Sequence, residues 1–305
     1  MIATSRRRLL LVAGGAALLA LSTRNRRDSV YTWRSNVLGA ETRVMISERS
    51  EAEASSIASE IQAEALRLES IFSLYRQESE LARLNRDGIL RAPSEDFRNL
   101  LARSIEGWHR TAGAFNVAIQ PYWAALARSL ARSGNPPDER ETNRLLALAD
   151  PRRIDLSPSR VRLEAGMALT FNGIAQGYIT DAAAHLLERR GLRDILIDLG
   201  EVYALPGRPW HIEAGAAGLQ NASRRAFATS CGRATPFTSD GRWHHLIDPD
   251  TGQSARAVTR VTVASTSATE ADLLSTALAV ALPARHGAIL TRFSGERAYV
   301  KVTPS

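Results

Sequence analysis

The segment His244–Gly252 combines a side chain that could carry a proton with a turn that would hold it in place. Asp248 and Pro249 suit the first two positions of a tight turn, and Gly252 tolerates the positive φ that can follow them. His245 would end a short strand just before this corner, and a neutral imidazole is a suitable general base near pH 7. Most histidines on hairpins are ordinary surface residues, so this interpretation needs support from other segments.

A second pair of residues could bind a hard cation. Asp272 and Thr276 are four residues apart in a predicted helix, so their side chains share one face. A carboxylate and a hydroxyl oxygen are ligands that suit Mg²⁺. Taken alone, the same pair also describes a polar stripe on a capped helix.

The segment Thr170–Gly177 is rich in small residues where a predicted strand meets a helix. Glycine lets a ligand approach the backbone, and a helix N-terminus favours an anion such as phosphate. The glycine spacing differs from that of the dinucleotide-binding fingerprint. A tight packing junction between strand and helix explains the segment equally well.

Two aromatic residues could contact a flat ring. Tyr75 lies at the end of a predicted helix, and Phe115 follows a turn at Gly113. Both are equally consistent with packing in the core.

The elements that must position these residues mix strands and helices without strict alternation, which indicates an α+β fold. Helices are expected after caps at Ser50, Ser94, Asn172 and Thr269. The first is expected to end near Tyr75, the third near Arg190 and the fourth at Pro283, and the second carries Trp108 on its apolar face. Strands are expected at 37–47, 154–156, 161–163, 167–171, 194–199, 210–214, 226–230, 258–264 and 295–302.

Composition and charge limit the classes of function. The chain has 305 residues, 44% hydrophobic and 23% charged, which suits one large globular domain or two smaller ones. Residues 1–27 hold six arginines and no acidic residue, so most of the net charge of +7 lies there and the rest is nearly neutral. That distribution argues against a nucleic-acid partner. Cys231 is the only cysteine, so no intramolecular disulfide is expected, and a small buried thiol is its expected state.

Residues 1–27 are expected to be a targeting segment. Ser5–Leu10 is similar to the twin-arginine export signal of bacteria. The apolar run 9–21 has 13 residues, which suits a signal and is short for a spanning helix of about 20 residues. No clear cleavage site follows, so the run could instead tether the protein to the membrane. The expected location is therefore the periplasm, or the inner membrane facing the periplasm.

Six segments resemble, in the same order, the motifs of the ApbE-type flavinyltransferases, which are FAD:protein FMN transferases. They are residues 75–85, 113–116, 170–177, 228–232, 245–252 and 271–277, and the resemblance covers roughly residues 35–302. Asp-Pro-x-Thr-Gly at 248–252 and Asp-x-x-x-Thr at 272–276 are the most specific motifs.

The resemblance implies an ApbE-like, T-fold-like α+β unit over residues 28–305, in which mixed sheets pack with helices. It implies FAD as the substrate, with Mg²⁺ on its pyrophosphate. A threonine or serine hydroxyl of an acceptor protein would attack the FMN-side phosphorus, and AMP would leave. In this family the acceptor is a subunit of a membrane-bound electron-transfer complex. Positioning and charge neutralisation would then dominate catalysis.

The resemblance also assigns roles by matching position. Asp272, Thr276 and the carbonyl of Gly173 would hold Mg²⁺, and His245 is the candidate base. The candidates for the flavin or adenine pocket are Leu38, Tyr75, Ala114, Phe115, Asn116 and Leu246, with Thr170 and Gln176 as further FAD contacts.

Three positions depart from the family pattern through loss of charge. Thr170 and Asn116 stand where the family has aspartates, and Gln176 stands where it has a lysine. Hydrogen bonding would survive there with less charge assistance. Cys231 also interrupts the usual Ala-Thr-Ser-Gly motif, which suggests a changed loop.

These departures leave two alternatives open. One is a pyrophosphatase that splits FAD into FMN and AMP with water as the acceptor. The other is a non-catalytic periplasmic flavin-binding assembly factor. A hydrolase that uses Ser230 or Cys231 with His245 is weaker, because the chain has no nucleophile elbow.

Overall fold

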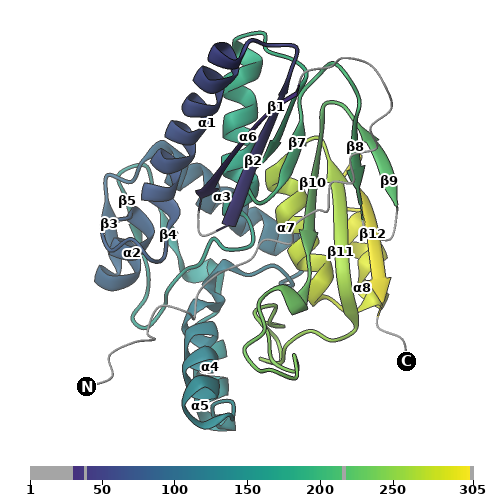
Figure 1. The fold of residues 1–305 in the computed structure, drawn as a ribbon. Coiled ribbons are helices and arrows are strands. Elements are labelled where there is room, and N and C mark those ends of the chain that lie inside the picture. Colours follow the sequence, from purple (N-terminus) through teal and green to yellow (C-terminus); the bar gives the residue numbers. More distant parts are fainter. Residues whose placement is uncertain (1–29, 38–39, 215–217, 303–305) are drawn as a thin grey trace, which may run out of the picture.

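A computed structural model describes residues 30–37, 40–214 and 218–302 of the chain (Figure 1). The expected export segment 1–27, its apolar run 9–21 and Leu38 lie outside the described residues. Within the described ranges, no helix has both the length and the apolar character needed to cross a bilayer.

A seven-stranded sheet forms the centre of the molecule, with strand order β1-β2-β6-β7-β10-β11-β12. Every neighbouring pair in it is antiparallel. The strands are β1 (Val30–Val37), β2 (Ala40–Ser47), β6 (Ile195–Asp198), β7 (Val202–Ala204), β10 (Arg225–Ser230), β11 (Val258–Ser265) and β12 (Arg297–Val302).

Both faces of this sheet are buried. Successive side chains of a strand point to opposite faces, so a single strand contributes to two cores. In β2, Val44 and Ile46 belong to the large core under the helices, whereas Met45 belongs to a smaller core on the opposite face. A two-stranded ribbon of β8 (Trp210–Glu213) and β9 (Leu219–Ala222) contributes Trp210 and Ile212 to that smaller core.

Helices cover the other face of the sheet (Figure 1). The helices are α1 (Glu51–Phe72), α2 (Glu80–Asp87), α3 (Glu95–Arg110), α4 (Gln120–Ser133), α5 (Glu139–Leu146), α6 (Ala175–Arg189), α7 (Ala268–Val280) and α8 (Pro283–Leu290). Helix α6 packs between α1 and α7, and α7 lies directly on β10 and β11. Short 3₁₀ helices span Val117–Ile119, Pro151–Arg153 and Gly232–Ala234.

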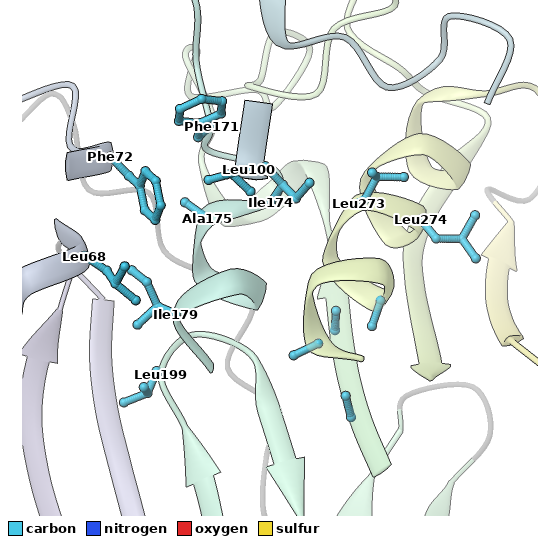
Figure 2. Packing of buried hydrophobic residues seen from close by; sticks show 14 of the residues in the cluster. Leu68, Phe72, Leu100, Phe171, Ile174, Ala175, Ile179, Leu199, Leu273 and Leu274 are labelled. Atoms are coloured by element: carbon cyan, nitrogen blue, oxygen red, sulfur yellow. The ribbon is translucent and has the colours of Figure 1, made fainter. Parts of the chain in front are cut away.

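The interface between these helices is apolar. Figure 2 shows Leu68 of α1 and Ile179 of α6 pointing toward one another. Phe72 at the end of α1 packs edge-on against Phe171, with ring centroids 5.8 Å apart. Helix α7 is buried on almost its whole circumference, as expected for a helix enclosed by a core. The helices that carry the candidate site are therefore fixed by packing.

Two further units complete the fold. A three-stranded sheet contains β3 (Ile89–Arg91), β5 (Arg160–Arg162) and β4 (Asp155–Leu156) in that order. Helices α4 and α5 form a hairpin that projects from the body (Figure 1). The base of this hairpin begins directly after residues 114–117, which reach the candidate site.

Several predicted elements are confirmed. The Ser50 side chain accepts from the Glu53 amide at 3.3 Å and the Glu53 carboxylate accepts from the Ser50 amide at 3.1 Å, as a capping box requires. Ser94 caps α3. The hairpin expected near residues 154–163 is formed by β4 and β5.

The strand predicted at residues 167–171 was wrong. This segment pairs with none of the described strands, because other groups occupy its backbone. The Asn85 amide donates to the Leu169 carbonyl at 2.8 Å and accepts from the Leu169 amide at 2.7 Å. The Thr170 amide donates to the Val117 carbonyl at 2.8 Å. One side chain thus replaces a neighbouring strand, which residue periodicity cannot reveal.

Some predicted boundaries were also wrong. The first helix ends at Phe72, and α2, which was not predicted, follows a cap at Ser79. The residue before α6 is Ile174 rather than Asn172, Ser267 rather than Thr269 caps α7, and Pro283 begins α8. The strand expected at 37–47 corresponds to β2, and its partner β1 was not predicted.

Candidate active site

One cavity collects segments that lie far apart in the sequence. It lies where the ends of β10 and α7 meet the start of α6 and the residues that precede α4. Its lining includes residues 114–117, Thr170, 172–173, Gln176, Glu201, 229–231, 245–247, Pro249, Asp272 and Thr276. All of the predicted site residues among these ranges therefore face one space.

The three predicted cation ligands all line the cavity. A Cβ atom built on Gly173 would lie 3.0 Å from the Thr276 hydroxyl, so only glycine lets this backbone come so close. The Gly177 amide donates to the Asp272 carboxylate at 3.1 Å and holds it between α6 and α7. The Ser230 hydroxyl lies 3.3 Å from that of Thr276.

Two carboxylates of the lining are buried. Asp272 is 4% exposed and Glu201 is 5% exposed. Burial raises the pKa of Asp272. Burial also raises the pKa of Glu201, and the nearby carboxylates of Asp272 and Asp198 add to the rise. No lysine or arginine occurs among the described residues that line the cavity, so both acidic groups lack a cationic side chain.

This arrangement fits Mg²⁺. Buried carboxylates in proteins are normally paired with a cation or bound to a metal. Asp272, the Thr276 hydroxyl and the Gly173 carbonyl offer only oxygen ligands, which Mg²⁺ prefers. Over residues 30–37, 40–214 and 218–302 there is no cluster of three or more His, Cys, Asp or Glu side chains with metal-binding geometry. A cation here would therefore keep coordination positions open for phosphate or water.

His245 also lines the cavity, with one ring nitrogen engaged. Its Nδ1 is 3.4 Å from the Thr235 carbonyl, which also accepts from the His245 amide at 3.2 Å. This contact favours a proton on Nδ1 and leaves Nε2 as the basic nitrogen. Burial lowers the pKa of His245 to about 4, and the neighbouring His244 acts in the same direction. The ring is therefore neutral at physiological pH.

The turn after His245 is present, but the predicted strand before it is not. His245 lies between two isolated bridges, which join His244 to Pro236 and Ile247 to Ser254. The Gly252 amide donates to the Asp248 carbonyl at 2.8 Å, and Gly252 has a φ of +69°. The Tyr122 hydroxyl donates to the Gly252 carbonyl at 2.7 Å, so a helix side chain fixes the turn.

The predicted flavin contacts divide into three groups. Ala114, Phe115, Asn116, Thr170, Gln176 and Leu246 line the cavity. Tyr75 is 45% exposed and lines an adjoining pocket that shares Asn172 and Gln176 with the cavity. Leu38 is outside the described residues, so its predicted contact stays a prediction.

Asn116 makes a hydrogen bond that an aspartate at this position could not make. Its side-chain oxygen accepts from the Ala118 amide at 2.9 Å, and its NH₂ group donates to the Ala149 carbonyl at 2.8 Å. A carboxylate cannot make the second bond, because it has no hydrogen to donate. The amide thus ties the cavity wall to the loop after α5.

Sequence reasoning missed two acidic residues and misjudged one cysteine. Glu201 lines the cavity, and Asp181 of α6 accepts four hydrogen bonds from the first residues of α7 and its cap. Neither residue lies in a segment that had been singled out. Cys231 is partly exposed and lines the cavity, so the expectation of a buried thiol was wrong.

Comparisons with known proteins agree with this geometry. The sequence model of the ApbE family matches residues 38–300. A FAD:protein FMN transferase of Treponema pallidum is 29% identical, over 87% of this chain and 82% of that protein. One of Haemophilus influenzae is 25% identical, over 68% of this chain and 67% of that protein.

Solved structures of ApbE proteins have a fold similar to that of this chain. The flavinyl transferase ApbE of Pseudomonas stutzeri in its apo form matches with a TM-score of 0.78 and 25% identity, covering 93% of this chain and 94% of that chain. The ApbE protein of Thermotoga maritima matches with a TM-score of 0.75 and 26% identity, covering 90% and 94%.

Proposed function

This chain belongs to the ApbE family and is a flavin transferase; we propose that it moves the FMN part of FAD onto a protein hydroxyl. The acceptor hydroxyl is that of a threonine or serine, AMP is released, and the reaction depends on Mg²⁺. One observation carries the proposal: Gly173, Asp272, Thr276 and His245, taken from three separate segments, line one cavity.

The lining of the cavity combines the apolar and oxygen-bearing groups that FAD binding needs. Phe115, Leu246 and Ile247 provide apolar surface for a ring system. Asp272, Thr276 and the Gly173 backbone add oxygen ligands to the same lining, where a cation would meet a diphosphate. Mg²⁺ bound there would neutralise the diphosphate and stabilise the charge that develops on the leaving oxygen.

His245 supplies the proton transfer. Its neutral Nε2 takes the proton of the acceptor hydroxyl as that oxygen attacks the FMN-side phosphorus. The new bond is a phosphoester between the acceptor oxygen and FMN, the bond that breaks joins that phosphorus to the bridging oxygen, and AMP leaves. The Thr235 carbonyl keeps the ring oriented through Nδ1.

The cellular setting is also part of the proposal. The arginine pair and apolar run within residues 1–27 support export, with the catalytic part of the chain on the periplasmic side. An acceptor in a membrane-bound electron-transfer complex is consistent with that location. The nearly neutral charge of residues 28–305 speaks against a nucleic-acid partner.

The proposal is tested by incubating the purified full chain with FAD, Mg²⁺ and an exported domain that bears a candidate flavinylation threonine. The expected result is a fluorescent acceptor band on a denaturing gel and one AMP per flavin attached. An acceptor with that threonine changed to alanine is the control and should stay dark.

Other outcomes separate the alternatives. Release of FMN and AMP without labelled acceptor would indicate a pyrophosphatase. Unchanged FAD that nevertheless binds tightly would indicate a flavin-binding protein without catalysis. Either result, with an acceptor that a related transferase does label, would overturn the proposed transfer.

A further inference from the structure

Glu201 is a buried acid at the cavity wall that the proposed transfer does not use. It follows β6 and Gly200, and 5% of its surface is exposed. Its carboxylate oxygen Oε2 accepts a hydrogen bond from the Thr229 amide at 3.3 Å. Glu201 also belongs to the lining of the cavity.

The surroundings of Glu201 place it beside the predicted cation ligands. Thr229 is followed by Ser230, whose hydroxyl lies 2.8 Å from Ser275 and 3.3 Å from Thr276. Asp272 and Glu201 line the same cavity, and the negative charge of Asp272 contributes to the raised pKa of Glu201. A single peptide unit of β10 thus connects Glu201 to the hydroxyls around the cation site.

Among the described residues that line the cavity, none is a lysine or arginine that could balance this charge. Asp198, the third carboxylate near Glu201, lies 3.4 Å from Arg43 and is outside the lining. Among the described lining residues, His245 is the only other titratable group besides Cys231, and its ring is neutral. Two buried carboxylates without a cationic partner are costly to hold, so they call for a cation.

We propose that Glu201 is a further cation-binding residue, which together with Asp272 lets the cavity hold a divalent cation before FAD arrives. The proposal rests on the proposed cation site at Asp272, Thr276 and Gly173. It follows that FAD meets a cavity already neutralised by the ion. Without the ion, the diphosphate would meet two carboxylates of its own sign.

Gln176 gives this chain a particular dependence on the cation. Its amide lies against the backbone of Gly200, the residue directly before Glu201. A lysine at position 176 would place an ammonium group where it could balance Glu201. The neutral glutamine leaves that task to the ion.

The test measures Mn²⁺ binding to the full chain without FAD, by electron paramagnetic resonance of free Mn²⁺. Glu201→Gln keeps an oxygen for the Thr229 amide and removes only the charge. We expect it to weaken Mn²⁺ binding at least tenfold, and Gln176→Lys to weaken it by a similar factor. Asp198→Asn is the matched control, because its carboxylate is paired with Arg43, and it should change binding less than threefold.

Melting temperature in EDTA gives a second readout that a merely structural role would not produce. Removing one of two repelling carboxylates should raise the melting temperature of Glu201→Gln above wild type in EDTA, and Mn²⁺ should then raise it less. A lower melting temperature in EDTA, or Mn²⁺ binding within twofold of wild type, would overturn the role of Glu201.

Failure of this inference is distinguishable from failure of the proposed function. If Asp272→Asn abolishes Mn²⁺ binding while Glu201→Gln leaves it intact, the cation site stands and the role of Glu201 falls. If Glu201→Gln weakens Mn²⁺ binding but the wild type labels no acceptor, the role of Glu201 stands and the proposed transfer falls.

Discussion

His244 and His245 are adjacent in the chain, yet their hydrogen bonds give them different tasks. His244 donates from Nε2 to the Ala255 carbonyl at 2.7 Å and accepts from the Leu246 amide at Nδ1. Its ring also fills the space above Gly232, where any Cβ atom would collide with it. His244 is therefore a structural residue, and only His245 keeps a nitrogen free for chemistry.

A substitution at His245 should remove catalysis and spare binding. His245→Gln should lower the rate of FMN transfer by roughly 10²–10⁴-fold, the usual contribution of a general base. The affinity for FAD, measured by flavin fluorescence, should stay within about threefold. His244→Gln is the comparison: it should lower the melting temperature because it disturbs the two hydrogen bonds of that ring, to Ala255 and Leu246. A His245→Gln enzyme with full transfer rate would rule out the assigned role.

The lowered pKa of His245 has a consequence for stability at acid pH. The folded pKa is about 4 and the reference value is 6.5, so between these values the unfolded chain binds the extra proton. The contribution of His245 to stability is therefore complete above pH 6.5 and is lost as the pH falls toward 4. At pH 5 the loss is about 2 kcal/mol.

Urea unfolding at pH 7.5 and pH 5 measures this loss. Wild type should lose about 2 kcal/mol more than His245→Gln between the two pH values, since other titrating groups are common to both proteins. Equal losses would show that His245 titrates alike in the folded and unfolded chains.

Asp181 joins α6 to α7, the two helices that build the proposed cation site. Its carboxylate accepts from the amides of Ala268 and Thr269 at 2.7 and 2.9 Å, and from the hydroxyls of Ser267 and Thr269 at 2.7 and 2.6 Å. A negative charge also suits the N-terminus of α7. Helix α6 thereby fixes the position from which Asp272 and Thr276 project.

Asp181→Ala should therefore destabilise the protein by about 3 kcal/mol or more, because it leaves buried donors without an acceptor. Chemical denaturation checks this value. Asp138 caps α5 in an exposed position, and Asp138→Ala should cost only about 1 kcal/mol. Similar costs for the two changes would mean that the Asp181 contacts add little to an ordinary cap.

Gly177 sets how closely α6 approaches α7. A Cβ atom there would collide with the Ala268 carbonyl and lie 2.8 Å from the Asp272 Cβ. Gly177→Ala should destabilise the protein by roughly 2–3 kcal/mol and weaken Mn²⁺ binding. Gly287 in α8 has open space around it, so Gly287→Ala should stabilise by about 0.5–1 kcal/mol and leave Mn²⁺ binding unchanged. Normal Mn²⁺ binding by Gly177→Ala would contradict the close-packing argument.

Sequence patterns predicted the helices and strands whose features are encoded in their own residues. The capping box of α1, the apolar periodicity of that helix and the apolar residues of β6 and β10 are local properties, and the α+β class follows from the elements they predict. The segment at 167–171 looked like a strand because its residues are apolar, whereas its hydrogen bonds come from the distant Asn85. Such long-range partners leave no periodic trace.

The residues of the candidate site also differ in whether the sequence alone reveals them. The motifs around His245 and Asp272 are short and contiguous, so the sequence exposes them directly. Glu201 and Asp181 belong to no recognisable motif, and their importance comes from burial and from partners on other elements. Those partners become visible only when the helices are packed.

The cavity depends on several elements that lie far apart in the sequence. Its lining begins at Ala114 and ends at Val280, and includes residues that precede α4, α6 and α8 or lie within β10 and α7. No single element could bind FAD alone. Ligand binding should consequently stabilise the complete fold rather than one part of it.

Thermal unfolding with FAD and Mg²⁺ tests this coupling. A ligand at 100 times its Kd that binds only the folded state stabilises it by about 2.7 kcal/mol, or about 5 °C for a chain of this size. FAD with Mg²⁺ should raise a single transition by that amount, whereas FAD in EDTA should give a much smaller shift. The reason is that Asp272 and Glu201 repel a diphosphate that no cation neutralises.

Riboflavin has no diphosphate, so any shift that it causes should be independent of Mg²⁺. Equal shifts for FAD with Mg²⁺ and in EDTA would contradict the electrostatic argument, and a separate transition that FAD leaves unmoved would contradict the coupling.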